Sequence, residues 1–357
     1  MNADDIMDHQ SPDKHQDALY ELGRLLLDSN YDFTTITPLS HARVLSRCVT
    51  DSSYCTDEGR TLRDIFGWSK PFERAALPPK MISLLEAANV IEHAVECAVG
   101  QTAKLRCNVR FSTIRHAQDS RKTIYVHSSY PTTRSDAVFF GPDTYRFVAL
   151  VEHELQRGAR ASQRNALKRI VDIGCGAGPG GIAAALKHPG AALFLADINP
   201  TALQYASVNA HLAGIASVTM VQSDLFAQLD GQFDLIVSNP PYLLDADARV
   251  YRHGGGAYGS GLATRIVLEG LPRLSPDGTL ILYSGVPIVD GKDVFRASVE
   301  STLREAGVDY TYTELDPDVF GEELESPGYE NVERIAAIAL VIRRATQGQA
   351  TQERAAQ

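Results

Sequence analysis

The feature that most constrains the fold is a regular alternation of apolar and helical segments in the second half of the chain. Near-continuous apolar strands that alternate with helices are typical of a parallel sheet covered on both faces. Two later strands, about 309–314 and 334–343, favour an antiparallel edge pair. The sequence therefore predicts a doubly wound α/β fold with a mostly parallel seven-stranded sheet and an antiparallel edge. The other predicted strands are 169–173, 192–196, 218–222, 235–238 and 279–283, and the predicted helices are 179–187, 200–213 and 261–274.

The 357 residues exceed what one such domain needs, which predicts a second, smaller domain. Apolar residues at helical spacing begin at 17–27, and alternating segments at 104–114 and 123–127 predict a β-hairpin. A short strand at 137–140 and a helix at 143–156 are predicted next. The expected division is a mostly helical domain over 1–100, a hairpin connector over 101–140, the α/β domain over 141–346 and a disordered tail over 347–357.

Charge and cysteine content narrow the class of protein. A formal net charge of −10 disfavours a nucleic-acid acceptor without excluding it, because phosphate binding relies on basic surfaces. The five cysteines are scattered without a C-x-x-C pair, so neither a disulfide framework nor a metal site is expected. No apolar run reaches 18 residues, and the polar N-terminus lacks the pattern of a signal peptide. We therefore expect a cytoplasmic protein without a membrane span, and the sequence carries no signal for an oligomeric state.

A glycine-rich segment, D-I-G-C-G-A-G at 172–178, directly follows the first predicted strand. Glycines at such a turn let the backbone bend sharply and approach a ligand closely. Gly176, Gly178 and Gly181 also match the dinucleotide pattern G-x-G-x-x-G, and Asp197 lies about 20 residues further on. This segment alone therefore leaves a nicotinamide-dependent dehydrogenase open as an alternative.

Two acidic residues follow the next two predicted strands. Asp197 is placed to accept hydrogen bonds from both hydroxyl groups of a ribose, although an acid here also suits the cap of the following helix. Asp224 is placed to accept a hydrogen bond from an exocyclic amine, with Leu225 and Phe226 flanking an adenine ring. Because both acids lie at the ends of neighbouring strands, they add to the signal of the glycine-rich segment.

The sequence Asn239-Pro240-Pro241-Tyr242 directly follows the fourth predicted strand. A planar amide or aromatic amine is a poor nucleophile because its lone pair is delocalised. The Asn239 side-chain carbonyl and the Pro240 backbone carbonyl can accept hydrogen bonds from the N–H groups of such an acceptor and orient its lone pair. The prolines stiffen the loop, and Tyr242 can stack on a flat acceptor. These positions predict catalytic roles for Asn239, Pro240 and Tyr242.

Taken in order, these motifs resemble those of class I S-adenosylmethionine-dependent methyltransferases of the N-P-P-Y branch. That branch includes release-factor glutamine methyltransferases and enzymes that methylate amino groups of DNA and RNA. The resemblance covers about residues 137–345 and implies a Rossmann-like fold, S-adenosylmethionine as the cofactor, and methyl transfer to an amide, guanidinium or aromatic amine. We expect the helical domain to recognise the acceptor, which is a protein or a small molecule.

Two further segments are similar to the release-factor methyltransferases. Residues 140–144, F-G-P-D-T, resemble the loop that lines their pocket, and 252–259 resembles their glycine-rich segment. The chain departs from the family pattern at Gly141, where a basic residue is usual, and at Tyr251-Arg252-His253, which replaces Glu-Pro. The predicted cofactor-binding residues are Asp172, Gly174, Cys175, Gly176, Gly178, Asp197, Ile198, Asp224, Leu225 and Asn239, and the predicted substrate-binding residues are Pro142, Thr144, Pro241, Tyr242 and Tyr258.

Three alternatives remain within the resemblance itself. The chain is also consistent with an rRNA or DNA amino-methyltransferase, with an enzyme that uses the aminobutyryl part of the cofactor, and with a non-catalytic module that only binds it. A separate hypothesis concerns the acidic residues between Glu314 and Glu333, which are placed to attract a cationic acceptor. The alternative for these acids is an ordinary solvated surface.

Overall fold

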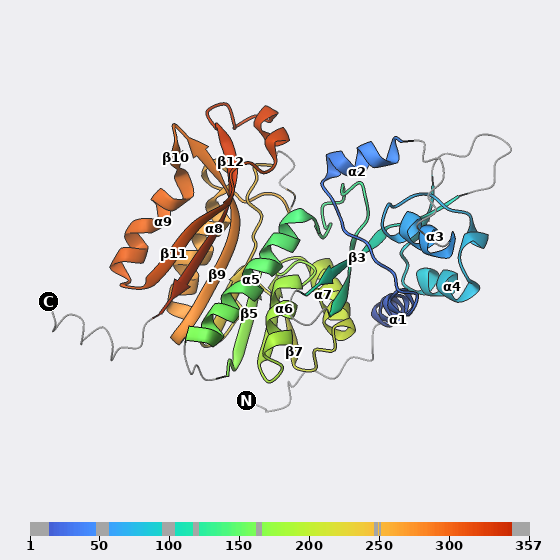
Figure 1. Ribbon diagram of the computed structural model, residues 1–357, viewed down its shortest axis with the longest axis horizontal. Coiled ribbons are helices and arrows are strands. Elements are labelled where there is room, and N and C mark those ends of the chain that lie inside the picture. The colour runs from blue at the N-terminus through green and yellow to red at the C-terminus, as the bar shows by residue number, and fades with distance from the viewer. Residues whose placement is uncertain are drawn as a thin grey trace, which may run out of the picture. The chain divides into compact units, whose positions relative to one another are not determined.

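A computed structural model describes residues 14–47, 57–94, 104–116, 121–161, 166–245, 249 and 251–344 (Figure 1). The chain divides into two compact units. One unit runs to Thr133 and also includes Ser207–Gly214, and the other runs from Arg134 to Ala206 and again from Ile215 onward. The predicted tail, 347–357, lies outside the described residues.

The first unit combines helices with two small antiparallel sheets. The hairpin predicted at 104–114 and 123–127 is present as β3 and β4, with Thr113 opposite Ile124. It belongs to the same unit as the helices and is not a separate connector, so the unit boundary lies at Thr133. The elements are α1 (Lys14–Asp28), α2 (Pro38–Leu45), α3 (Asp57–Phe66), a 3-10 turn at Arg74–Ala76, α4 (Pro79–Ala87), β1 (Ile91–His93), β2 (Leu105–Cys107), β3 (Val109–Arg115) and β4 (Lys122–Ser128).

Packing and hydrogen bonds explain why the hairpin joins the helices. Tyr31, just after α1, donates a hydrogen bond from its hydroxyl to the Phe111 carbonyl on β3 at 2.9 Å. The Thr113 amide donates to the Phe33 carbonyl at 2.8 Å, so the segment that follows α1 is hydrogen-bonded to β3. Phe66 of α3 packs edge-on against Phe111, and both side chains are fully buried. The hairpin therefore completes the hydrophobic core of this unit.

The second unit is built on the predicted sheet. Its strands lie in the order β11-β12-β9-β8-β5-β6-β7, and β10 pairs with the end of β9. The pairs among β5 to β9 are parallel, and β12 pairs antiparallel with both β9 and β11, which confirms the doubly wound sheet with an antiparallel edge. The strands are β5 (Arg169–Ile173), β6 (Ala192–Asp197), β7 (Val218–Gln222), β8 (Phe233–Ser238), β9 (Leu274–Val289), β10 (Lys292–Asp293), β11 (Asp309–Asp316) and β12 (Arg334–Arg343).

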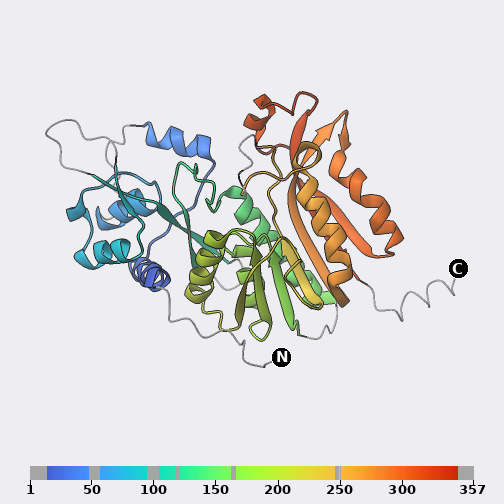
Figure 2. The same ribbon diagram turned by 180° about the vertical axis from the view of Figure 1, so that it is seen from behind.

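Helices cover both faces of this sheet, with α5 and α6 on one face and α8 and α9 on the other (Figures 1 and 2). Helix α9 was not predicted, although Asp293 caps its first turn and Phe295, Val299 and Leu303 form a buried stripe at helical spacing. The predicted helix 261–274 ends at Gly270, because Pro272 falls in a 3-10 turn (Leu271–Arg273) that leads into β9. The helices are α5 (Pro142–Ala161), α6 (Pro179–Lys187), α7 (Pro200–Leu212), α8 (Gly261–Gly270) and α9 (Val294–Glu305).

The short strand predicted at 137–140 is wrong, because this segment is an irregular loop. Ala137, Val138 and Phe140 are buried, which explains the strand-like pattern, but side chains rather than a sheet edge hold the adjoining backbone. Asn199 donates from Nδ2 to the Asp136 carbonyl at 2.9 Å, and Thr201 donates from its hydroxyl to the Asp136 carboxylate at 3.1 Å. The loop is thereby tied to the start of α7.

None of the helices in the described part of the chain is long and apolar enough to cross a lipid bilayer.

Candidate functional site

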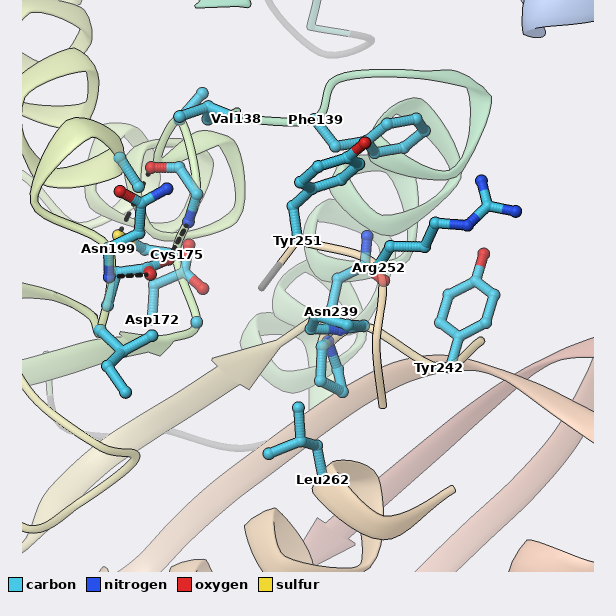
Figure 3. A pocket seen from close by; sticks show the side chains of 18 of the residues that line it. Val138, Phe139, Asp172, Cys175, Asn199, Asn239, Tyr242, Tyr251, Arg252 and Leu262 are labelled. Carbon is cyan, nitrogen blue, oxygen red and sulfur yellow. Dashed lines mark hydrogen bonds between the residues drawn. The ribbon is translucent and has the colours of Figure 1, made fainter. Parts of the chain in front are cut away.

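The candidate site lies beside β5, where the order of successive strands changes side: β6 and β7 follow on one side of β5, and β8 and β9 lie on the other. Strand β5 lies between β6 and β8, and Ile173 at its end is opposite Ala196 on one side and Ser238 on the other. Ligands of doubly wound sheets bind at such a switch point, beyond the carboxyl ends of the strands. A cavity of about 390 Å³ occupies this position, entirely within the second unit. Figure 3 shows Asn239 between Asp172, Cys175 and Asn199 on one side and Tyr251, Arg252 and Tyr242 on the other.

The glycine-rich turn lines one end of this cavity. Gly174 and Gly176 have φ values of 65° and 53°, a left-handed region that favours glycine. A Cβ atom added at Gly174 would have no neighbour within 4 Å, so its backbone faces open space. Gly178 does not line the cavity, because its Cα faces Ile182 and Leu195 in the packing between α6 and β6. The turn therefore offers backbone groups at Gly174 and Gly176, with the buried Cys175 between them.

Asp172 presents an unpaired carboxylate oxygen in this region. Its Oδ2 accepts a hydrogen bond from the Gly181 amide of α6 at 2.7 Å. Its Oδ1 is buried and has no hydrogen-bond partner among the described residues. Burial raises the pKa of Asp172 to about 7. An acid that lines a cavity, is buried and lacks one partner is suited to a cationic group of a ligand.

Asp197 at the end of β6 is held by two backbone amides. Its Oδ2 accepts from Gly176 at 2.8 Å, and its Oδ1 accepts from Asn199 at 2.9 Å. The cap of α7 is Asn199, whose side chain accepts from the Thr201 amide at 3.0 Å, so capping does not explain Asp197. Burial raises the pKa of the Asp197 carboxyl. Each of its oxygens keeps a lone pair for a further donor, as two ribose hydroxyls require.

Of the residues predicted to hold an adenine ring, Asp224 and Leu225 line the cavity, whereas Phe226 is buried in the hydrophobic core and does not. Ile198 lines the cavity and is 52% exposed, so its apolar side chain is accessible to a ligand there. Leu225 lines the same region with a positive φ of 50°. The Asp224 carboxylate contacts the Arg265 guanidinium of α8 at 3.2 and 3.4 Å. Sequence reasoning missed Arg265, which lies 41 residues from its partner.

The loop Asn239-Pro240-Pro241-Tyr242 crosses the middle of the cavity, and all four residues line it. The loop starts from a fixed point, because the Ser238 hydroxyl at the end of β8 donates to the Ile173 carbonyl at 2.6 Å. The Asn239 carboxamide makes no hydrogen bond with any residue in the described ranges and is partly exposed to the cavity. The Pro240 carbonyl likewise has no hydrogen-bond partner among the described residues, and Pro240, although buried, lines the cavity. Both oxygens are thus available to accept hydrogen bonds from a ligand.

The glycine-rich segment that follows holds this loop through backbone contacts. The Gly254 amide donates to the Leu243 carbonyl at 2.9 Å, and the Leu243 amide donates to the Arg252 carbonyl at 3.2 Å. A Cβ atom at Gly254 would lie 1.9 Å from the Gly259 carbonyl oxygen and 2.7 Å from the Pro241 carbonyl oxygen. Only glycine therefore permits this close approach. Tyr258 lies in the same segment but does not line the cavity.

The far end of the cavity is lined by aromatic residues and one arginine. Sequence reasoning had not assigned Phe139, Phe320, Tyr251 or Arg252 to the site, although it had noted the unusual Tyr251-Arg252-His253 segment. Thr144 lines the cavity as predicted, whereas Pro142 does not. The Arg252 guanidinium pairs with Glu323 and lies 3.4 Å from Asp245. The positive charge of Arg252 at this end is therefore balanced by two acidic side chains.

The acidic segment between Glu314 and Glu333 reaches this end of the cavity through Phe320. Several of its acids already have partners within the protein. Asp316 pairs with Arg146 at 3.0 Å, Glu314 pairs with Arg334 at 3.0 Å, and Glu323 pairs with Arg252. The segment is thus less available to a cationic acceptor than its sequence implies.

Comparison with known proteins agrees with this geometry. Residues 159–285 match the methyltransferase small domain family. A release factor glutamine methyltransferase of Deinococcus radiodurans is 32% identical over 202 residues, 54% of this chain and 66% of that protein. One from Xylella fastidiosa is 36% identical over 38% of this chain and 52% of its own length. A ribosomal protein uL3 glutamine methyltransferase of Bradyrhizobium diazoefficiens is 33% identical over 36% and 44%. The chain thus matches less than two thirds of the length of these relatives.

Proposed function

Because residues 159–285 form a class I S-adenosylmethionine-dependent methyltransferase domain of the N-P-P-Y branch, we propose that this protein methylates a side-chain amide nitrogen of a protein. The observation that carries this proposal is the pair of unpaired acceptors, the Asn239 carboxamide and the Pro240 carbonyl, beside the glycine-rich turn. The relatives named above act on glutamine in a release factor and in ribosomal protein uL3, which supports a glutamine amide as the acceptor.

The residues present fit S-adenosylmethionine. The unpaired Asp172 oxygen suits the amino group of the cofactor, and Asp197 suits its ribose hydroxyls. Ile198 and Leu225 supply apolar walls for adenine, with Asp224 at the edge. When bound, S-adenosylmethionine supplies an electrophilic methyl group on a positively charged sulfur. The glycine-rich turn leaves the open space that such a ligand needs.

The N-P-P-Y loop contributes to methyl transfer by positioning the acceptor amide. Asn239 Oδ1 and the Pro240 carbonyl accept hydrogen bonds from the amide N–H groups, which turns the nitrogen lone pair toward the methyl donor. The same two oxygens stabilise the positive charge that develops on nitrogen during transfer. Tyr242 does not act as a base, because burial raises the pKa of its phenol and the hydroxyl already donates to Asp143. After transfer the positively charged nitrogen is strongly acidic, so its proton passes to water without a protein base.

Charge at the acceptor end favours a neutral acceptor over a guanidinium. Arg252 lines the cavity there as a cation, and its partners Asp245 and Glu323 are both engaged with arginines. Asp143, the other acid at this end, accepts hydrogen bonds from two tyrosines and Arg146. A cationic acceptor would be repelled by Arg252. Among the described residues that line this end, no carboxylate is left unpaired to compensate for that repulsion. An amide or an aromatic amine avoids this repulsion.

We also propose that the first unit recognises the protein that carries the acceptor. The relatives act on proteins of translation, which supports a protein partner and a cytoplasmic location over a nucleic-acid acceptor. The net charge of −10 points the same way, because it does not favour phosphate binding.

Mass spectrometry of the full chain with trideuteromethyl-labelled S-adenosylmethionine and size-fractionated lysate tests the proposed activity. We expect lysate-dependent S-adenosylhomocysteine and one trideuteromethyl group on a glutamine of a protein. Label in nucleic acid would indicate the amino-methyltransferase alternative, and methylthioadenosine would indicate use of the aminobutyryl group. Cofactor binding without consumption in every fraction would leave a binding module. The Asn239→Ala variant serves as the background control.

Gly254→Ala is expected to abolish most of the activity. A methyl group at this position would lie 1.9 Å from the Gly259 carbonyl oxygen and 2.8 Å from Tyr242 Cα, so the N-P-P-Y loop must move. A displacement of about 1 Å at a reacting centre costs roughly a hundredfold in rate. The measurement is kcat for S-adenosylhomocysteine release. Gly190→Ala is the matched control, because its Cβ would meet nothing within 4 Å; equal losses in both variants would contradict the steric argument.

A further inference from the structure

A buried carboxylate connects the N-P-P-Y loop to two distant parts of the chain. Asp143, in the first turn of α5, is 2% exposed and lines the cavity. Its Oδ2 accepts a hydrogen bond from the Tyr242 hydroxyl at 2.8 Å, and its Oδ1 accepts from the Tyr283 hydroxyl of β9 at 2.6 Å. The Arg146 guanidinium also donates to Oδ1 at 3.0 Å. Three donors from three segments thus converge on one side chain.

The Tyr242 ring is held on its other sides by packing. One side lies against Gly285 of β9, where an added Cβ would be 2.3 Å from Tyr242 Cε2. Phe320 meets the ring edge-on, with 5.8 Å between centroids and an angle of 72° between planes. With 8% of its surface exposed, the ring has little freedom to turn. Its single polar anchor in the described structure is the hydrogen bond to Asp143.

The direction of that hydrogen bond determines what Tyr242 offers to a ligand. Because the hydroxyl donates its only proton to Asp143, it cannot donate that proton to an acceptor in the cavity. Burial raises the pKa of the Tyr242 and Tyr283 phenols, so both remain donors at physiological pH. Tyr242 therefore presents its ring, and not a proton, to the cavity.

We propose that Asp143 is a positioning residue for methyl transfer, which fixes the Tyr242 ring as a rigid wall beside the Asn239 and Pro240 acceptors. This inference rests on the proposed methyl transfer. A planar acceptor amide can lie against such a wall, which restricts the approach of its nitrogen to the geometry of attack. Arg146 balances the charge of Asp143 and joins it to Asp316 at 3.0 Å, so the wall is also connected to the segment that carries Phe320.

Kinetics of Asp143→Asn and Tyr242→Phe test the role of this bond. We expect each substitution to lower kcat about 10- to 100-fold while the Kd for S-adenosylmethionine changes less than about twofold. Tyr242→Phe removes this hydrogen bond, whereas Asp143→Asn replaces one of two accepting oxygens by an NH2 group, so that Tyr242 and Tyr283 compete for the oxygen that is left. Because both changes act on the same bond, the double variant should lose less than the product of the two single losses. Tyr283→Phe leaves the Tyr242 bond in place and should have a smaller effect. Additive losses in the double variant would overturn the proposal.

The same unit contains a matched control pair. Tyr312 of β11 donates its hydroxyl to Asp293 Oδ2 at 2.5 Å, and neither residue lines the cavity. Tyr312→Phe and Asp293→Asn make the same two changes in a comparable phenol–carboxylate bond, so they reproduce a general loss of stability. We expect kcat to stay within about twofold of the original value in both. A fall similar to that of Asp143→Asn would show that the effect is merely structural.

A second readout does not depend on activity. With 13C-labelled tyrosine, nuclear magnetic resonance of the full chain should show altered or exchange-broadened Tyr242 ring signals in Asp143→Asn and unchanged signals in Asp293→Asn. Unchanged Tyr242 signals in Asp143→Asn would overturn the positioning role even if the protein proved not to be a methyltransferase. Altered signals with normal kcat in an active enzyme would overturn its role in transfer. A wild-type protein that never consumes the cofactor would instead refute the proposed function, and the inference with it.

Discussion

Asn239→Ala is expected to lower the rate of S-adenosylhomocysteine formation by about 100- to 1000-fold. The Asn239 carboxamide lines the cavity and makes no hydrogen bond with the described residues, so its oxygen is available to the acceptor. Its loss removes one of the two oxygens that orient the amide and stabilise charge on nitrogen. The cofactor contacts at Asp172, Gly176 and Asp197 come from other strands and remain. The Kd for S-adenosylmethionine, measured by calorimetry, should therefore change by less than about threefold.

Asn239→Asp is the conservative companion of this variant. The aspartate keeps an accepting oxygen at the same place, adds a negative charge and loses the side-chain amide donor. We expect its kcat to lie between those of the wild type and Asn239→Ala. Normal turnover in Asn239→Ala would remove the mechanism proposed for the N-P-P-Y loop. A large loss of cofactor binding in both variants would show that Asn239 binds the cofactor and does not orient the acceptor.

Asp172→Asn is expected to weaken S-adenosylmethionine binding about 10- to 100-fold at pH 7.5, the cost of one charge-assisted hydrogen bond. In the free protein, burial holds the pKa of Asp172 at about 7, so the carboxyl is largely protonated below that pH. A cationic amino group requires the carboxylate, and binding below pH 7 must therefore release a proton. The affinity of the wild type should decrease above about pH 8, where an α-amino group loses its own proton, and it should fall about tenfold for each pH unit below 7. The variant should lose this slope.

The same substitution should stabilise the cofactor-free fold at neutral pH. The folded-state pKa of Asp172 is raised above its ordinary value of 3.8, so the folded protein holds a proton that the unfolded chain releases. Stability in the free protein thus falls as pH rises from about 4 to 7, by at most about 4 kcal/mol from this group. The carboxamide introduced by the substitution would carry no charge, and its oxygen would still accept from the Gly181 amide. A higher thermal midpoint at pH 7.5 for Asp172→Asn than for the exposed control Asp290→Asn checks this, and an unchanged midpoint would contradict it.

The strands and their following residues were predictable because their signals are local. In a parallel sheet, the carboxyl ends of all strands meet at one edge, so residues after separate strands are brought together whatever the details of packing. For this reason, Asp172, Asp197 and Asn239 could be placed in one site from the chain alone, and the structure shows all three lining the cavity. The regular apolar strands also predicted the order of parallel and antiparallel elements.

Some predictions that depended on family pattern or on isolated apolar runs concern residues that the structure places outside the cavity or in an irregular loop. Gly178, Pro142 and Tyr258 do not line the cavity, because being adjacent in sequence to a motif does not determine where a residue faces. Residues 137–140 looked like a strand because their side chains are buried, yet bonds from Asn199 and Thr201 to Asp136 hold the segment as a loop. Helix α9 escaped prediction although its cap, Asp293, and its buried stripe were both present in the sequence.

By itself, the sequence determined the sheet, the glycine-rich turn and the acids and N-P-P-Y loop at the strand ends, because periodicity and strand polarity act over a few residues. Only the tertiary structure decided which distant side chains complete the site. Asp143 and Tyr242 lie 99 residues apart in the chain, and Arg252 and Glu323 lie 71 residues apart. Such contacts arise from the packing of whole elements, which fixes side chains against each other in three dimensions and leaves no periodic trace along the chain.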